Sequence, residues 1–454
     1  MKKNVLILFA AAIGNSLIAQ TNPAITSWLR NTTSITGRHY VSGNSTPIVD
    51  AVLANVQKVQ YSTDWVYVTT NGIPAYITGP FLDGNPSLAT TRNGAIFQIP
   101  LNPTKNTGTA TATKGGNIGQ FINGVALFDY RDGVAWNPTT NALCGGPGNS
   151  PCPGGPGATN AWNRDAIPAE KAGFDCAKAH PAMGNYHHHQ NPSAFNLDLV
   201  VTSTICSTYP SDGLYVINST QHAPLLGFAY DGFPIYGAYG YAKTDGTGGI
   251  TRIKSSYQIK SYPTGLRTNG PSINQIVGTQ TMFNGYFRED YEYIAHTESD
   301  YLDVHNGRFC ITPEYPNGTY AYFTTVDANH NSAYPYVVGP TYYGNVTASK
   351  VSSIVETTLT YSPVLKNPNF DATALNILVY PNPAQDFIAI QSQMNASNLK
   401  AELIDELGKI IQTRELLQGS TLCIFETETL YNGIYLVKIS DNSKQKTYKV
   451  IIQK

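Results

Sequence analysis

The sequence predicts a mostly β protein, in which a β-sandwich or barrel-like domain precedes a small C-terminal β-sandwich. Short apolar or aromatic runs alternate with turn residues along most of the 454 residues, a spacing typical of sandwiches and barrels. The composition agrees, because 30 Tyr, 40 Gly and 28 Pro suit strands and ordered turns. Helix-period segments are few, and residues 168–172 indicate at best one short helix.

The N-terminus predicts export. Lys2 and Lys3 precede an apolar run, residues 5–13, that is too short to span a bilayer, and Ala19 is a small residue at a suitable cleavage point. We expect residues 1–19 to be a signal peptide and no later segment to form a transmembrane helix. A formal net charge of −1, with 13% charged residues, leaves no basic surface of the kind that binds nucleic acid.

Composition divides the rest of the chain into four parts. Residues 20–60 are polar and weakly patterned, and residues 61–345 carry the strand-like runs, for example 65–68, 95–99 and 124–128. Residues 346–375 are rich in Ser, Thr and Asn and are typical of a linker. Residues 376–454 again contain strand-length runs, and we expect a separate small β-sandwich there.

The six cysteines suit an exported protein, in which disulfides persist. Cys144 and Cys152 flank a Gly/Pro-rich loop that has no core of its own, so a short disulfide would order it. Cys176 and Cys206 could also pair, although sequence does not fix connectivity. Cys310 has no evident partner, which leaves a free thiol or a soft metal ligand as alternatives.

The histidines are concentrated in one segment. The chain has nine, and four of them lie between His180 and His189. If residues 186–189 are extended, His187 and His189 share one face of the strand and His188 points to the other. Such a His-x-His pair can give a metal two nitrogen ligands, and the remaining ligands would come from elsewhere in the fold.

The segment around this cluster resembles the signature of the YHYH-domain family. It reads DCAKAHPAMGNYHHHQNP over residues 175–192, and His188 stands where the family motif has its second Tyr. Further matching stretches are residues 222–237, 306–309, 312–320 and 334–339. The resemblance covers most of residues 61–345. It implies little about activity, because the family is largely uncharacterised.

The C-terminal part resembles a second family. YPNP at residues 380–383, a Gly-Lys-Ile turn at 408–410, NGIYLVKI at 432–439 and KVII at 449–452 together are similar to the type A sorting domain of the Bacteroidetes type IX secretion system. The resemblance implies passage through the periplasm and across the outer membrane by the type IX machinery. It also implies removal of this domain and release from the cell or attachment to its surface.

Four histidines match the YHYH pattern and are our candidate metal ligands: His180, His187, His189 and His222. Three or four imidazoles suit copper or zinc, with copper slightly favoured at an exported site that offers only nitrogen and phenol ligands. Supporting roles are expected for Tyr186, Tyr230 and Tyr236 as hydrogen-bond donors or a phenolate ligand, and for Asp175 and Asp231 as partners of the imidazoles.

Two classes of function follow from these residues. The first is a transition-metal site, used for storage, sensing, redox or hydrolytic chemistry. The second is an extracellular glycan- or peptide-binding module, in which aromatic residues contact the ligand and the histidines are structural. Nucleophile elbows, His-Glu-x-x-His zinc motifs and phosphate loops are missing from the sequence, so it assigns no catalytic residue.

Overall fold

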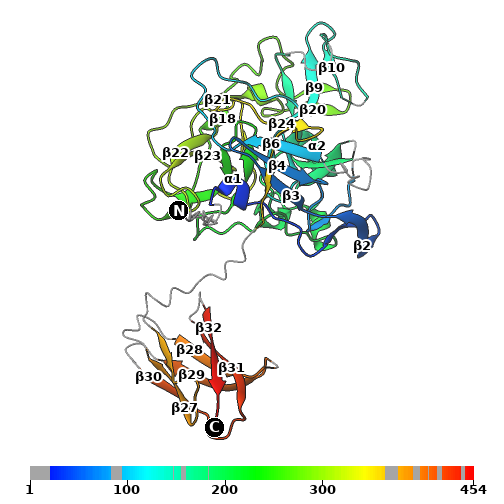
Figure 1. Ribbon diagram of the computed structural model, residues 1–454. Coiled ribbons are helices and arrows are strands. Elements are labelled where there is room, and N and C mark those ends of the chain that lie inside the picture. Colours follow the sequence, from blue (N-terminus) through cyan, green and yellow to red (C-terminus); the bar gives the residue numbers. More distant parts are fainter. Residues whose placement is uncertain are drawn as a thin grey trace, which may run out of the picture. The chain divides into compact units, whose positions relative to one another are not determined.

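The computed structural model describes residues 21–82, 95–146, 148–154, 160–182, 184–362, 377–391, 399–406, 408–416, 422–440 and 445–454. The expected signal peptide, residues 1–19, lies outside these ranges. The chain forms two compact units, residues 1–361 and 362–454 (Figure 1). Both are built mainly of strands, which confirms the predicted mostly β fold class. Within the described ranges, no helix combines the length and apolar character that a membrane crossing requires.

An eight-stranded mixed sheet forms the centre of the first unit. Its pairs are antiparallel except β13 with β8 and β15 with β23, which are parallel. The first of these parallel pairs joins the histidine segment to the sheet. In spatial order the strands are β12 (Ala179–Ala182), β13 (Asn185–His188), β8 (Ala126–Phe128), β7 (Asn117–Phe121), β14 (Leu225–Ala229), β15 (Pro234–Tyr236), β23 (Thr319–Phe323) and β22 (Gly307–Cys310).

A five-stranded antiparallel sheet packs against this centre. Its order is β24 (Ser349–Val351), β6 (Ala95–Pro100), β4 (Trp65–Thr70), β3 (Val56–Tyr61) and β25 (Leu359–Thr360). The edge strands β24 and β25 come from the segment expected to be a linker, and β3 comes from the weakly patterned N-terminal part. These segments form strands although their composition did not predict them. Short edge strands become ordered by pairing with a neighbouring strand, and composition does not reveal that pairing.

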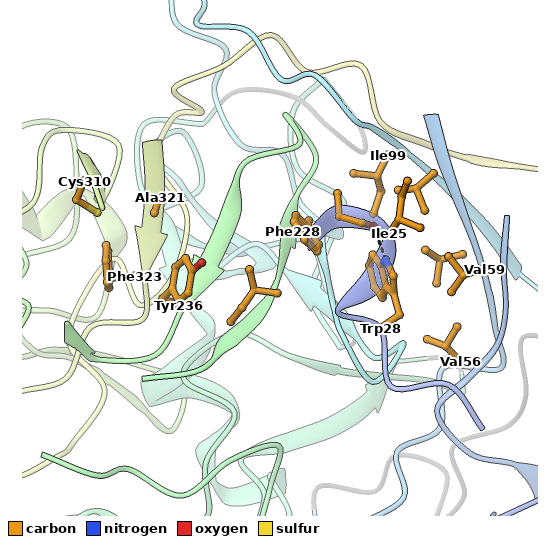
Figure 2. Packing of buried hydrophobic residues seen from close by; sticks show 14 of the residues in the cluster. Ile25, Trp28, Val56, Val59, Ile99, Phe228, Tyr236, Cys310, Ala321 and Phe323 are labelled. Atoms are coloured by element: carbon orange, nitrogen blue, oxygen red, sulfur yellow. Dashed lines mark hydrogen bonds between the residues drawn. The ribbon is translucent and has the colours of Figure 1, made fainter. Parts of the chain in front are cut away.

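The short helix α1 (Pro23–Thr26) lies between the two large sheets. Asn22 caps it by accepting a hydrogen bond from the Ala24 backbone, and the Trp28 indole donates to the Ala24 carbonyl at 2.7 Å. Figure 2 shows Ile25 and Trp28 inserted between Phe228 of the eight-stranded sheet and Val59 of the five-stranded one. The Trp28 and Phe228 ring centroids are 5.5 Å apart. The residues expected to be weakly patterned therefore supply part of the main core.

Smaller elements surround these sheets. A three-stranded sheet has the order β2 (Asn44–Leu53), β1 (Thr36–Val41) and β5 (Ile77–Thr78), and another has β10 (Ala142–Cys144), β9 (Arg131–Asn137) and β11 (Asn163–Asp165). Three two-stranded antiparallel sheets pair β16 (Tyr239–Tyr241) with β17 (Ile250–Arg252), β18 (Tyr257–Ile259) with β21 (Tyr291–Tyr293), and β19 (Gln275–Val277) with β20 (Gln280–Met282). The other helical elements in the described ranges are α2 (Ala166–Glu170) and the 3-10 turns η1 (Lys171–Gly173), η2 (Phe195–Leu197), η3 (Thr204–Ser207) and η4 (Arg288–Asp290).

The cysteine pairs suggested by the sequence are present. Disulfides join Cys144 to Cys152 and Cys176 to Cys206, while Cys310 and Cys423 are free and buried. The second disulfide ties the segment just before β12 to η3. It therefore restrains the backbone close to the histidine cluster.

The second unit is a two-sheet sandwich. One sheet has the order β26 (Leu378–Tyr380), β27 (Phe387–Gln391) and β30 (Leu422–Glu426), and the other has β29 (Ile410–Leu416), β28 (Leu399–Ile404), β31 (Gly433–Ser440) and β32 (Gln445–Ile452). A single apolar cluster, which includes Ile388, Leu403, Phe425 and Val437, is shared by both sheets. The predicted small C-terminal β-sandwich is therefore confirmed.

Candidate metal centre

The centre is built on the hairpin formed by β12 and β13. The two strands are antiparallel, and His180 lies directly opposite His187 in their register. Directly opposed side chains share one face of a hairpin, with Cβ atoms roughly 5 Å apart. His189 is two residues further along and returns to the face of His187. The alternation that the sequence predicts thus brings three imidazoles together.

His188 points to the other side, as predicted. Its Nε2 lies 2.7 Å from the Tyr76 hydroxyl, and its ring meets Phe121 edge-to-face. Burial lowers the pKa of His188 to about 3, so this imidazole is neutral. His188 therefore packs as a core residue and does not join the other three.

The three imidazoles converge through single ring nitrogens. One nitrogen each from His180, His187 and His189 lies within 4.8 Å of the other two, and all three residues are buried. The Nε2 atoms of His187 and His189 are 3.0 Å apart. A tetrahedral zinc ion with bonds of about 2.1 Å would hold its ligand atoms about 3.4 Å apart. The spacing is therefore close to that of a metal-ligand set.

Two of the rings are held in a defined tautomer. The Nδ1 atom of His187 donates to the Asn185 carbonyl at 2.8 Å, and that of His189 donates to the Asp129 carbonyl at 2.6 Å. A carbonyl oxygen can only accept, so Nδ1 carries the proton and the neutral ring presents a lone pair at Nε2. Metal-binding histidines are commonly oriented in this way by a backbone carbonyl.

Glu170, at the end of α2, completes the group. Its Oε2 lies 3.2 Å from Nε2 of His180 and 3.2 Å from Nε2 of His189. The side chain of Glu170 is 23% exposed, against 5% for His180 and 3% for His189, although the Oε2 atom that faces the imidazoles is buried. Glu170 is not among the ligands that the sequence predicts. The only available signal was an acid in the short helical segment just before the cluster.

The position of Glu170 follows from how α2 is anchored. Asp165 caps the helix by accepting from the Ile167 backbone, and the Ala166 backbone donates to the Tyr130 carbonyl at 2.8 Å. The second oxygen of Asp165 accepts from the buried hydroxyl of Tyr336 at 2.6 Å. These contacts join residues that are far apart in sequence, which explains why no local pattern reveals Glu170.

Electrostatics within the group favour a bound cation. Burial, together with the neighbouring His189 and His180, holds the pKa of His187 well below its ordinary value. Burial opposes ionisation of Glu170, but contacts with His180 and His189 outweigh it and leave the pKa of the carboxyl well below its usual range. The group therefore combines an ionised carboxylate with the His187 imidazole, whose protonation burial disfavours, and such a donor set suits a bound cation.

Aromatic rings pack against two of the imidazoles. Phe128 stacks on His187 with ring centroids 3.8 Å apart, and Phe174 meets His180 edge-to-face at 4.9 Å. Phe174 is buried and Phe128 is partly buried. Such a lining fixes the imidazole orientations and lowers the local dielectric, which strengthens the attraction between a cation and its ligands.

The fourth histidine from the sequence is not brought to this group. The ring of His222 packs against Tyr236, Tyr241 and Phe323, and its Nδ1 donates to the Ala223 carbonyl. The three-histidine set found among the described residues does not include it. His222 lies before the start of β14 and packs on Tyr236 of β15, whose hydroxyl donates to Glu314 at 2.8 Å.

The expected supporting residues have other contacts. Asp175 accepts from the Tyr186 hydroxyl and from the Gly79, Ala177 and Ala179 backbones, so it orders the approach to β12. Asp231 accepts from the Tyr322 hydroxyl and caps its own turn. Backbone carbonyls, and not these carboxylates, orient the imidazoles of His187 and His189.

The two-unit β architecture and the buried histidine group define the class: a two-domain β protein with a candidate metal centre in its larger domain. Residues 96–335, just over half of the chain, match the YHYH protein family, and the chain belongs to that family.

Residues 378–453 match the secretion system C-terminal sorting domain. The resemblances seen in the sequence are thus confirmed. A domain of this kind directs cargo to the type IX secretion machinery, so the protein is secreted or displayed at the cell surface. No curated protein matches the chain.

Proposed function

We propose that the YHYH domain is an extracellular transition-metal-binding domain, in which His180, His187 and His189 bind the ion through nitrogen and Glu170 through a carboxylate oxygen. The observation that carries the proposal is the meeting of the His187 and His189 Nε2 atoms at 3.0 Å while both Nδ1 atoms donate to carbonyls. Two lone pairs at this distance repel unless a metal ion or a proton lies between them. A metal ion satisfies all four groups at once.

The donor set narrows the choice of metal. Three imidazoles and one carboxylate suit Zn(II) and Cu(II), which are the two candidates. No thiolate is available from Cys176, the cysteine next to the hairpin, because it is in a disulfide. Cu(II) binds nitrogen and oxygen ligands more tightly than Zn(II) does. The ion that occupies the site would therefore depend on how much of each metal is available to the protein.

The geometry also bears on what the ion does. With Glu170 bound, the site has four protein ligands and is closed, as in structural or storage sites. A metalloenzyme would need an open position, which Glu170 can create by moving toward the solvent on its exposed side. In both cases the metal holds α2 against the β12–β13 hairpin. Metal binding is therefore the proposed function, and any catalytic activity would depend on it.

The test is elemental analysis of the secreted chain from residue 20, purified without a His-tag and reconstituted with zinc or copper. We expect about one ion per chain, lost in the His187→Ala/His189→Ala double variant with the β-sheet circular dichroism preserved. His222→Ala and the exposed His296→Ala are matched controls that should keep the metal. Absence of metal in every sample would overturn the proposal and favour a glycan- or peptide-binding module with structural histidines, whose ligand binding would resist chelators.

A further inference from the structure

Two adjoining cavities form a groove on the first unit. One has a volume of about 540 Å³ and is lined by Asn22, Asn102, Phe233 and Tyr315 among others. The second has a volume of about 200 Å³ and is lined by Asp64, Trp65 and Asn345 among others. Both include Asn102 and Pro103 in their walls, so they meet there. The larger volume lies within the range of roughly 300–1,000 Å³ that is usual for ligand sites.

The chemistry of the walls indicates a neutral, hydroxyl-rich ligand. The partly exposed rings of Trp65 and Tyr315 supply apolar surface, and the exposed side chain of Asn102 supplies an amide donor and acceptor. Asn345, whose amide nitrogen already donates to Thr104, supplies a carbonyl acceptor. The described lining contains no Lys, Arg or His and a single carboxylate, Asp64. A phosphate or other anion would meet no cation there. Sugars combine an apolar C–H face, which packs on aromatic rings, with hydroxyls that pair with amides and carboxylates.

The groove is held in shape by regular structure. Trp65 begins β4 and lies opposite Pro100 at the end of β6, and the Leu101 backbone donates to the Asp64 carbonyl at 2.8 Å. These pairings bring the Asp64–Trp65 and Asn102–Pro103 segments together from separate strands. On the other side, the Asn345 amide donates to the Thr104 hydroxyl at 2.9 Å. The walls are therefore preorganised, which reduces the entropic cost of binding a ligand.

The strand order argues against an extended peptide as the ligand. Peptides that bind in extended form commonly add to an open edge of a sheet. Here β4 lies between β3 and β6, and β6 pairs with β24 over residues 96–98, so the outer edges of this sheet are on β24 and β25. The groove offers side chains in place of an open backbone edge.

We propose that this groove binds a short neutral oligosaccharide, with Trp65 as the stacking platform and Asn102 as the central hydrogen-bonding group. The site is separate from the histidine centre, because none of the four residues of that centre lines it. Export to the cell surface would place the groove among extracellular polysaccharides. The protein would then carry two independent binding sites.

The test is binding of the secreted chain from residue 20 to an array of neutral gluco-, xylo-, manno- and chito-oligosaccharides, followed by calorimetry with the best binder. Asn102→Ala and Trp65→Phe should each weaken binding at least tenfold while the circular dichroism stays unchanged. Asn196→Ala, an exposed Asn on η2, is the matched control and should bind normally. EDTA treatment and the His187→Ala/His189→Ala variant should leave the affinity unchanged.

Three outcomes would overturn the proposal. They are the absence of binding to every oligosaccharide, unchanged affinity in both groove variants, and binding of a peptide library that depends on Asn102 while the oligosaccharides fail. Loss of sugar binding on metal removal would show that the two sites are coupled and would contradict their independence.

Discussion

At the residue scale, metal binding at the centre depends on which imidazole nitrogens carry protons. Carbonyl acceptors fix the Nδ1 protons of His187 and His189, so both Nε2 lone pairs enter the same small space. Glu170 Oε2 lies 3.2 Å from His189 Nε2 at the edge of this space. A metal ion bound there competes with protons for the same nitrogen lone pairs. Binding to this centre should therefore weaken as the pH falls.

Replacing Glu170 tests whether the carboxylate is a ligand. Glu170→Gln keeps the size and removes the charge, so we expect the affinity for zinc or copper to fall roughly tenfold or more. Competition with a chromophoric chelator would measure this change. Glu298→Gln, at a side chain that is 63% exposed, is the matched control. An unchanged affinity for Glu170→Gln would remove Glu170 from the ligand set and leave an open three-histidine site.

At the element scale, the β12–β13 hairpin converts sequence spacing into a site. A register shift of one residue would move His187 and His189 to the opposite face. Asp175 helps to prevent this, because its buried carboxylate accepts from the Ala179 backbone at the start of β12 and from Tyr186 on β13. Tyr186 thus joins the two strands from the side opposite the imidazoles. The hairpin is a structural support for the centre, and it contributes no phenolate to it.

Tyr186→Phe should separate stability from metal binding. The variant loses the 2.8 Å hydrogen bond to Asp175, so the free energy of unfolding should fall by about 1–3 kcal/mol. Denaturant unfolding in EDTA would measure that loss, while elemental analysis should still find one ion per chain. A variant that folds normally and no longer binds metal would instead support a direct role for the tyrosine.

At the scale of the whole molecule, the sequence predicts those features that depend on local alternation. The mostly β class and the strands near residues 65–68, 95–99 and 124–128 follow from short apolar runs bounded by turn residues. The shared face of His187 and His189 follows from the period of two in a strand. Features that depend on distant pairing were not predictable. Glu170 is placed by contacts of α2 with Tyr130 and Tyr336, and the edge strands β24 and β25 take their order from β6 and β3.

The tyrosine-rich composition also has a consequence for the whole fold. Several buried Asp carboxyls accept from tyrosine hydroxyls, among them Asp165 from Tyr336, Asp175 from Tyr186 and Asp231 from Tyr322. Burial outweighs these bonds and raises the pKa of the three carboxyls to about 8, about 7 and about 6. Each carboxyl therefore takes up a proton more readily in the folded chain than in the unfolded chain, in which an Asp titrates near pH 3.9.

The contribution of Asp165 to the free energy of unfolding decreases as the pH rises. Its stabilising contribution is complete below about pH 4 and is lost as the pH rises toward about 8, at roughly 1.4 kcal/mol per pH unit for this one group.

Asp165→Asn mimics the protonated acid, since its carbonyl can accept from Ile167 and its amide can donate to Tyr336. We expect the variant to match the parent near pH 4 and to be more stable at pH 8. Denaturant unfolding in EDTA across this range would measure the difference, with the exposed Asp245→Asn as the control. The buried His187 and His188 pull the total stability the other way below about pH 6.5, so the informative quantity is the difference between parent and variant. Parallel curves for the two proteins would show that Asp165 is already ionised in the fold at neutral pH.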